Sequence, residues 1–260
     1  TYGVGQLMAH ALSRGAKRLV LGLGGSATND GGCGAAAALG VEFYDSRGRT
    51  FVPTGGTLGD IHRISAENLE PLPPVTVLCD VDNPLCGPRG AAAVFGPQKG
   101  ADPDMVRLLD AGLAYLAAVL RRDTGRDVLD MPGGGAAGGF GAGCAAFLGG
   151  TLRSGIETVL DVIQLDRRLP DYQLVVTGEG RLDAQSLDGK VVSGVARRCR
   201  AHGVPAAALV GALSLDRAAL EALSLSAARS INPDGASYAE AAAHAAPNYR
   251  AALTALLEEY

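Results

Sequence analysis

Short apolar runs alternate with longer amphipathic segments along most of the chain. The runs are rich in Val, Leu and Ala and end at polar or glycine-rich residues, which is typical of buried strands; they lie at residues 18–23, 75–79, 173–177 and 206–210. The clearest amphipathic segment begins at Asp102-Pro103, where we expect Asp102 to be the N-cap of a helix with proline in its first turn. It carries apolar residues at helical spacing: Val106, Leu109, Leu113, Leu116 and Leu120. This alternation predicts an α/β fold.

The arrangement of these segments predicts two domains. Residues 41–45 alternate in polarity, and a turn at Ser46-Arg-Gly48 returns the chain into residues 50–52, so we expect a hairpin there. In the last third of the chain, strands and helices alternate regularly, as in a Rossmann-like parallel sheet. We therefore expect an α/β domain with glycine-rich loops over residues 1–170, and the C-terminal part of a Rossmann-like α/β domain over residues 171–260.

Composition and charge argue against several classes of protein. The 260 residues carry a net charge of −4 and no basic run, so a nucleic-acid-binding surface is not expected. No stretch offers about 18 uninterrupted apolar residues, so we expect no membrane-spanning helix. The five cysteines are scattered without metal-ligand spacing, which favours reduced thiols in a cytoplasmic protein.

A glycine-rich loop follows the first apolar run and leads into a short helical segment at residues 35–39: Gly22-Leu-Gly-Gly-Ser-Ala-Thr-Asn-Asp-Gly-Gly-Cys-Gly34. Glycines let the backbone approach a ligand closely, and free N–H groups at a helix start favour an anion. The candidate residues for binding a phosphate or substrate are Gly24, Gly25, Ser26, Thr28, Asn29 and Asp30. The structural alternative is a tight turn with close packing of helix on strand.

Carboxylates follow the apolar run at residues 75–79. Asp80, Asp82 and Asn83 come directly after it, and ligands of open α/β sheets bind at the carboxyl ends of strands. If the strand geometry continues, Asp80 and Asp82 point to the same side, where one ligand could meet both. The structural alternative is an Asx turn before Pro84.

Two further segments offer groups to an anion. Lys99 lies in a loop between Gln98 and Gly100 and could reach a phosphate, whereas a solvated surface lysine is the commoner case. A second glycine-rich loop, at residues 132–143, has almost no polar side chains. It offers either backbone N–H groups to a ligand or room for a neighbouring segment.

A second charged cluster follows the apolar run at residues 173–177. It contains Glu179, Arg181, Asp183 and Lys190. Arginine and lysine suit a phosphate or a carboxylate, and the acidic side chains suit Mg²⁺ or hydroxyl groups. The alternative is a solvated charged loop.

These features together favour phosphoryl transfer, in which catalysis is mostly positioning and neutralisation of charge. No Walker motif is present, because Gly189-Lys190 lacks the upstream glycine and is followed by Val191. One alternative is an NAD(P)-dependent dehydrogenase, since Gly22-x-Gly24-x-x-Ala27 follows a strand and Asp45 lies about twenty residues further on. Another is a truncated fragment that binds an anion or a partner without turnover.

Five motifs, in the same order, resemble those of the type-1 glycerate kinase family: Gly22-Leu-Gly-Gly-Ser-Ala-Thr-Asn-Asp-Gly-Gly32, Cys79-Asp-Val-x-Asn-Pro-Leu-Cys-Gly87, Phe95-Gly-Pro-Gln-Lys-Gly-Ala101, Gly-Ala-Ala-Gly-Gly at 135–139, and Thr177-Gly-Glu-Gly-Arg-x-Asp183 with Gly189-Lys190. The resemblance implies ATP-dependent phosphorylation of D-glycerate to 2- or 3-phosphoglycerate with Mg²⁺. It implies a two-domain glycerate-kinase-like fold with the active site in the inter-domain cleft. It also implies that roughly the first hundred residues of the family, with a Ser-Phe-Lys-Gly motif, are lacking here, so that the Rossmann-like domain is incomplete.

The hypothesis for the reaction gives catalytic roles to Asp80, Asp183 and Lys190. Either Asp80 or Asp183 would accept the proton of the substrate hydroxyl, and the choice between them stays open. Asp80 and Asp82 would hold Mg²⁺, and Lys190 would neutralise developing charge on the phosphate.

The remaining candidates would bind the substrates. Residues 24–30 would hold a phosphate group or the carboxylate of glycerate, with Ser26 and Thr28 as donors, and Lys99 would reach a phosphate. Asn83 would orient a ligand, and Arg181 would act beside Lys190. Glu179 is a further candidate for a metal ligand or a base.

Overall fold

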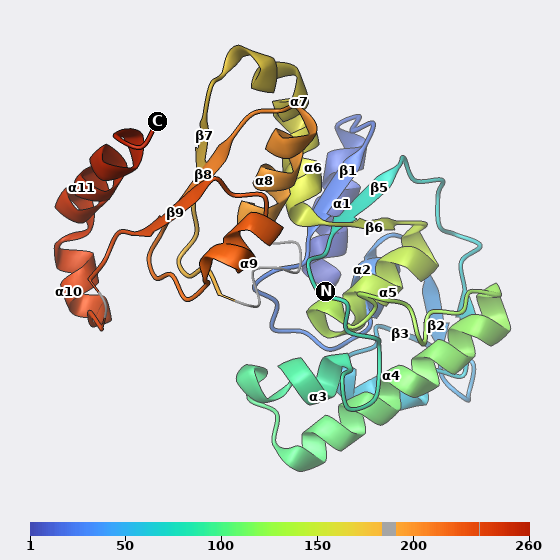
Figure 1. Ribbon diagram of the computed structural model, residues 1–260. Helices are drawn as coiled ribbons and strands as arrows, with labels where there is room; N and C mark the ends of the chain where they lie inside the picture. Colours follow the sequence, from blue (N-terminus) through green and yellow to red (C-terminus); the bar gives the residue numbers. More distant parts are fainter. Residues whose placement is uncertain (184–190, 234) are drawn as a thin grey trace. The chain divides into compact units, whose positions relative to one another are not determined.

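The computed structural model describes residues 1–183, 191–233 and 235–260 (Figure 1). The chain forms two compact units, Thr1–Gly155 and Ile156–Tyr260, and each is described by itself. The division comes earlier than the expected one after residue 170, because Leu160 and Leu169 pack in the core of the second unit. Lys190 lies outside the described residues.

The first unit contains a parallel sheet in the order β1-β5-β6. Strands β1 (Leu19–Gly22) and β5 (Val75–Leu78) occupy two of the predicted apolar runs, and Leu21 pairs with Val77. Strand β6 (Thr151–Arg153) was not predicted; only Leu152 of its three residues is apolar, so its sequence carries little strand signal. The carboxyl ends of all three strands meet at one edge of this sheet.

An antiparallel sheet, in the order β3-β2-β4, is the second sheet of this unit. Strands β2 (Glu42–Tyr44) and β3 (Thr50–Phe51) form the expected hairpin. The Asp45 carboxylate holds its turn by accepting hydrogen bonds from the N–H groups of Arg47 and Arg49 at 2.8 and 2.9 Å. A 3₁₀ helix, η1 (Gly55–Asp60), follows the hairpin and is followed by strand β4 (Arg63–Ser65).

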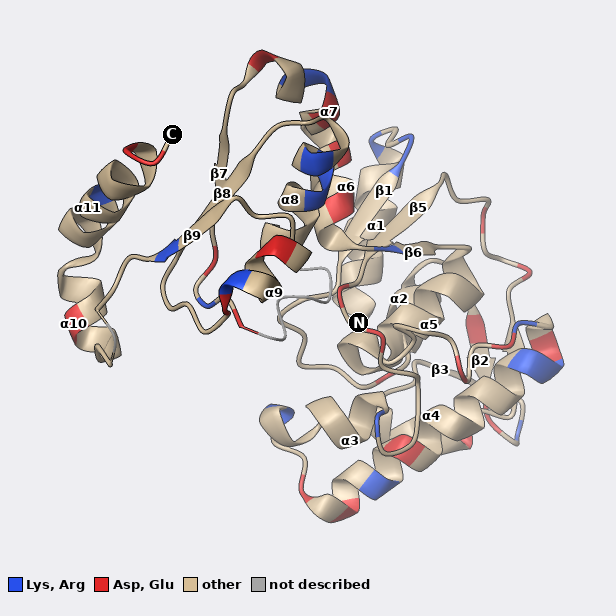
Figure 2. Ribbon diagram, in the orientation of Figure 1, with Lys and Arg blue, Asp and Glu red and all other residues tan. Residues whose placement is uncertain are grey.

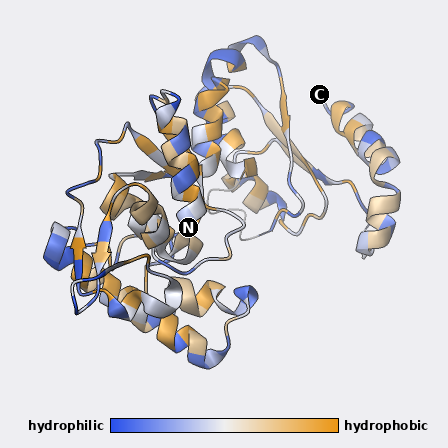
Figure 3. Cartoon of the chain, turned by 180° about the vertical axis from the view of Figure 1, so that it is seen from behind, coloured by the Kyte–Doolittle hydropathy of each residue, from blue (hydrophilic) through white to orange (hydrophobic). Residues whose placement is uncertain are grey.

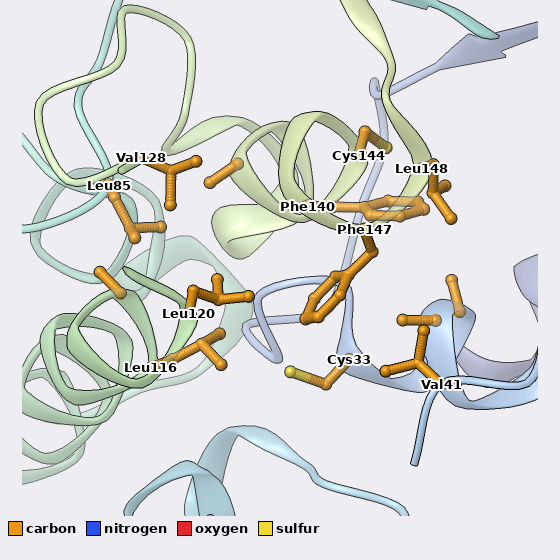
Figure 4. Packing of buried hydrophobic residues seen from close by; sticks show 14 of the residues in the cluster. Cys33, Val41, Leu85, Leu116, Leu120, Val128, Phe140, Cys144, Phe147 and Leu148 are labelled. Carbon is orange, nitrogen blue, oxygen red and sulfur yellow. The ribbon is translucent and has the colours of Figure 1, made fainter. Parts of the chain in front are cut away.

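Helices surround these sheets, and their bounds are α1 (Tyr2–Ser13), α2 (Cys33–Ala38), α3 (Ala91–Phe95), η2 (Pro97–Lys99), α4 (Pro103–Thr124) and α5 (Ala136–Leu148). Asp102 caps α4 as expected, with Oδ1 accepting from the Met105 N–H at 2.8 Å. The buried face of α4 carries Leu116 and Leu120, which Figure 4 shows in the core with residues of α5. Neither α4 nor any other helix among the described residues is long and apolar enough to cross a membrane.

The second unit is built on a parallel sheet in the order β7-β8-β9, with β7 at Val175–Thr177, β8 at Ala206–Val210 and β9 at Ala227–Ser230. Its helices are α6 (Gly155–Val162), α7 (Leu165–Arg168), η3 (Leu169–Asp171), α8 (Val191–Ala201), α9 (Arg217–Ala222), α10 (Tyr238–Ala243) and α11 (Ala245–Leu257). Every residue of β8 is buried, because helices cover both faces of the sheet.

The two faces of β8 have different neighbours. Ala208 and Val210 pack with Val192 on the side of α8, and Leu209 packs with Leu256 of α11 on the other side. Figures 1 and 3 show α8 and α11 on opposite sides of the sheet, with hydrophobic and hydrophilic positions alternating along the helices. The doubly covered sheet confirms the predicted α/β fold with Rossmann-like strand pairing.

An ion-pair cluster joins α6, α7 and α8 (Figure 2). The guanidinium of Arg198 contacts Glu157 and Asp161 at 2.7 Å each, and it also pairs with Asp166. These contacts, together with Leu160 and Leu169, explain why residues after Gly155 belong to the second unit rather than to the first.

Candidate functional site

A cavity of about 310 Å³ lies at the carboxyl ends of β1 and β5 in the first unit. Its polar lining comes from the first glycine-rich loop, from the residues after β5 and from η2: Gly24, Gly25, Ser26, Asp80, Gln98 and Lys99. We call it the unit 1 cavity. The structure therefore brings together five residues that the sequence marked separately, at the sheet edge where open α/β folds bind ligands.

The Asp80 carboxylate is held in place by the residues that follow β6. Its Oδ1 accepts a hydrogen bond from the Gly155 N–H at 2.7 Å and another from the Ser154 hydroxyl at 3.3 Å. Oδ2 accepts no hydrogen bond from the described residues, and Asp80 is exposed. One oxygen is thus fixed and the other is available to a ligand.

Lys99 is half-buried and is not the solvated surface lysine that the sequence left possible. Its Nζ donates a hydrogen bond to the Thr28 carbonyl at 2.7 Å, which ties η2 to the first glycine-rich loop. Burial lowers the pKa of Lys99, while the negative charge of Asp30 opposes that shift. An ammonium group has three donors, so two remain for an anion in the cavity.

The Asp30 carboxylate is hydrogen-bonded to neighbouring residues, and its predicted role in ligand binding stays a prediction. The residue is 5% exposed, and its carboxylate accepts from the Thr28 and Thr1 hydroxyls at 3.0 and 2.7 Å. It also accepts from the N–H groups of Gly32 and Gly34 at 3.0 and 3.3 Å. The start of the six-residue helix α2 is therefore already bonded to a carboxylate, and the prediction that its N–H groups are free for an anion is wrong.

Asn29 is the unsatisfied polar residue of this loop. Its Nδ2 and Oδ1 are both buried, and neither has a hydrogen-bond partner among the described residues. Asn29, Thr28 and Thr54 line a smaller cavity of about 280 Å³ in the same unit. Leaving a buried polar group unpaired costs about 1–3 kcal/mol, so the side chain of Asn29 is a costly feature of this loop.

The second glycine-rich loop packs directly against the backbone of the first one, at positions where only glycine fits. A Cβ atom at Gly138 would lie 2.0 Å from the Thr28 carbonyl oxygen, and one at Gly143 would lie 2.2 Å from that of Gly31. The two loops are further joined by a 3.0 Å hydrogen bond from the Gly31 N–H to the Gly138 carbonyl. Ala137, which lines the unit 1 cavity, adopts the left-handed conformation with φ 52°, a strained backbone of the kind that gathers at functional sites.

Asp82 and Asn83 do not line the unit 1 cavity. Strand β5 ends at Leu78, so the strand geometry that would align Asp82 with Asp80 does not continue. Asp82 forms an exposed ion pair with Arg89 at 3.0 Å, and the Asn83 amide donates to the Arg89 carbonyl at 2.8 Å. Within residues 1–183, 191–233 and 235–260, no group of three or more His, Cys, Asp or Glu side chains could hold a metal ion. Asp82 thus lies in an exposed ion pair with Arg89 and outside the unit 1 cavity that Asp80 lines, and a shared Mg²⁺ site stays a prediction.

The second predicted cluster lies in the second unit, after β7. The Oε1 atom of Glu179 is buried without a partner among the described residues. Arg181 lines a separate cavity of about 290 Å³, together with three polar residues that were not predicted, one after β8, one at the end of β9 and one beyond it: Ser214, Ser230 and Asn232. These residues could have been predicted in the same way as Asp80, from polar side chains near the end of a strand. Asp183 is described, and Lys190 is not.

The dehydrogenase alternative does not agree with the structure. Asp45 ends a strand of the antiparallel sheet and is bonded within its own hairpin turn, whereas the dinucleotide fingerprint needs an acid after the neighbouring parallel strand. Ten residues, 23–32, separate β1 from α2, so no helix begins directly at the glycine turn.

Comparison with known proteins gives the same picture. The sequence model of the glycerate kinase family matches residues 1–259. The chain is 44% identical over 244 residues to a glycerate kinase of Bacillus cereus, a match covering 93% of this chain and 64% of that protein. It is 44% identical over 217 residues to the glycerate 2-kinase of Escherichia coli K12, covering 82% of this chain and 57% of that one. The chain thus spans about three fifths of the length of these curated relatives.

A solved structure is also similar. The crystal structure from Salmonella typhimurium LT2 assigned as a glycerate kinase 2 matches with a TM-score of 0.82 and 39% sequence identity. The match covers 99% of this chain and 69% of that one.

Proposed function

The chain belongs to the glycerate kinase family, and on that premise we propose that the complete protein transfers a phosphoryl group from ATP to D-glycerate. The observation that carries the proposal is the unit 1 cavity, where the Gly24-Gly-Ser26 backbone, Asp80 and Lys99 converge. A glycine-rich backbone, a cation and a carboxylate are what phosphoryl transfer requires of a protein.

Each group in the cavity has a role in this proposal. Lys99 neutralises charge that develops on the transferred phosphoryl group, and the Ser26 hydroxyl and the Gly24-Gly25 backbone hold its oxygens. Asp80 meets the substrate hydroxyl through Oδ2 and accepts its proton, while Ser154 and Gly155 keep Oδ1 in position. Asn29 lies in the same loop but does not line this cavity, and its role in binding a ligand stays a prediction.

Magnesium is part of the proposal. Mg²⁺ is commonly bound through one or two carboxylates together with substrate phosphates and water. Asp80 is the carboxylate of the cavity, and since this proposal uses its Oδ2 for the substrate hydroxyl, the ion would be held mainly by the phosphates of the nucleotide. When bound, Mg²⁺ would supply neutralisation of charge on the phosphates. Roles for Glu179, Arg181, Asp183 and Lys190, like the cytoplasmic location, stay predictions.

The product of the reaction is proposed to be 2-phosphoglycerate. The relative from Escherichia coli is named glycerate 2-kinase, and it is 44% identical to this chain. Phosphorylation at the 2-hydroxyl places the new phosphate beside the substrate carboxylate, and both anions then need neutralising groups within a few ångströms.

The test uses the full-length protein that contains this chain. ADP formation is measured with ATP, Mg²⁺ and D-glycerate, and the product is identified by ³¹P NMR. We expect ADP formation that depends on D-glycerate, with glycerol, which lacks the carboxylate, as a poor acceptor. Absence of glycerate-dependent ADP formation would contradict the proposal, and a product phosphorylated at the 3-hydroxyl would contradict its second part.

A further inference from the structure

The cavity of about 290 Å³ in the second unit is the starting point; we call it the unit 2 cavity. It lies where the three parallel strands β7, β8 and β9 end, and its lining includes Arg181, Ser214, Ser230 and Asn232. One residue thus follows β7, one follows β8, and two come from the end of β9 and the segment after it. This is the edge at which open parallel sheets covered by helices on both faces bind mononucleotides.

The floor of the unit 2 cavity is a pair of loops that stay hydrogen-bonded beyond the strands. The N–H groups of Gly211 and Ala212 donate to the carbonyls of Glu179 and Gly180, both at 3.1 Å. Further along, the Leu182 N–H donates to Ala212 and the Ser214 N–H donates to Leu182, both at 2.9 Å. The backbone positions of Arg181 and Ser214 are therefore set by the sheet itself.

Glycine is required where these loops meet. A Cβ atom at Gly211 would lie 2.4 Å from the Gly180 carbonyl oxygen, and one at Gly178 would lie 2.2 Å from that of Leu209. Both distances are too short for any side chain. The sequence after β7 and β8 is thus specialised for a close approach of two loops that ends in a polar cavity.

The wall of the cavity is rigid and polar. The Asn232 amide donates to the Gly211 carbonyl at 2.9 Å, and its N–H donates to the Ser230 hydroxyl at 3.2 Å. The Ser230 hydroxyl in turn donates to the Asn232 carbonyl at 2.8 Å. The amide nitrogen of Asn232 has a second hydrogen, for which the described residues provide no acceptor, and Asn232 lines the cavity.

We propose that the unit 2 cavity binds the ribose and a phosphate group of the nucleotide. The Arg181 guanidinium is the cation that pairs with phosphate oxygens, and the Asn232 amide and Ser214 hydroxyl are the partners of the ribose hydroxyls. A volume of about 290 Å³ is near the lower end of small-molecule sites, at roughly 300 Å³, which suits a ribose phosphate. This inference rests on the proposed function, because that function supplies the nucleotide.

The cavity is suited to an anion that bears hydroxyl groups, and glycerate is such an anion as well as the nucleotide. Binding experiments with two probes distinguish between these two ligands. ADP and D-glycerate are titrated separately into the full-length protein by calorimetry, in the wild type, in Ser214→Leu and in Asn232→Ala. Ser214 is exposed, and leucine there narrows the cavity without removing the backbone hydrogen bond. Asn68→Ala, at an exposed asparagine of the first unit, is the matched control.

We expect both cavity variants to weaken ADP binding by roughly threefold to tenfold, the loss of one or two hydrogen bonds, with D-glycerate binding unchanged. Asn68→Ala should bind both probes like the wild type. Unchanged ADP affinity in a folded Ser214→Leu protein would overturn the inference, and so would a loss confined to D-glycerate. If the wild type phosphorylates D-glycerate and both cavity variants bind ADP as tightly as the wild type, the inference about the unit 2 cavity fails and the proposed function stands. If the wild type neither turns over nor binds ADP, the proposed function fails with it.

Discussion

The Gly155 N–H donates to Asp80 Oδ1 at 2.7 Å, and a Cβ atom at residue 155 would lie 2.7 Å from Asp80 Oδ2. Gly155, two residues after β6, therefore both holds the carboxylate and leaves space for it. We expect Gly155→Ala to displace the carboxylate, and a misplacement of about 1 Å lowers turnover by up to roughly 10²-fold. The measurement is kcat and KM of the full-length protein.

The control for this variant is Gly59→Ala. Gly59 is exposed, and no atom lies within 4 Å of the position its Cβ would take, so this variant should match the wild type. Full activity of Gly155→Ala would show that the Asp80 carboxylate can move without consequence.

Lys99 should determine the alkaline side of the pH profile. Burial lowers its pKa below the ordinary 10.5, so the ammonium is present at low pH and is lost as the pH rises through the lowered value. We expect kcat/KM to fall over that range in the wild type. Lys99→Arg should move the fall to higher pH, because the guanidinium stays charged, and Lys99→Met should lose activity at every pH. Identical alkaline limbs in the wild type and Lys99→Arg would contradict this role.

Replacing Asn29 should lower enzyme activity without lowering thermal stability. Since both polar atoms are buried without a partner among the described residues, Asn29→Leu should not lower the midpoint of thermal unfolding. The same change should lower kcat/KM for D-glycerate if the amide contacts a ligand. A strongly lowered unfolding midpoint, with normal activity in the remaining folded protein, would assign Asn29 a structural role instead.

Replacing Asp30, in contrast, should lower the stability of the protein. An amide in its place would point a donor at the N–H groups of Gly32 and Gly34, so Asp30→Asn should lower the free energy of unfolding by about 1–3 kcal/mol. Urea denaturation measures this, and Asp60→Asn, at an exposed carboxylate, is the control. Unchanged stability would mean that the hydrogen bonds of Asp30 contribute little to α2.

Local patterns predicted the parts of the fold and site that depend on neighbouring residues. Strand β5 followed by Asp80 was predicted because an apolar run ends directly in a carboxylate, and the cap at Asp102 because proline follows it. The site residues Ser154 and Gly155 were missed because β6 is three residues long and has little apolar character. Their importance arises only when β6 pairs with β5.

Other features depend on where a strand stops or on partners far away in the sequence. The prediction for Asp82 assumed that β5 extends past Leu78, which no local pattern decides. The structural role of Asp30 depends on the Thr1 hydroxyl, 29 positions away. Ser230 and Asn232 were missed because strand β9 is four residues long and has little apolar character, so its sequence does not mark a sheet edge.

The most direct test of the account compares two neighbouring carboxylates in the full-length protein. Asp80 lines the unit 1 cavity, whereas Asp82 forms an exposed ion pair with Arg89. We expect Asp80→Asn to lower kcat for glycerate phosphorylation by roughly 10²- to 10⁴-fold. Asp82→Asn should change kcat by no more than about twofold, because exposed ion pairs contribute little. Equal losses in the two variants, or a loss in Asp82→Asn alone, would contradict the role of Asp80.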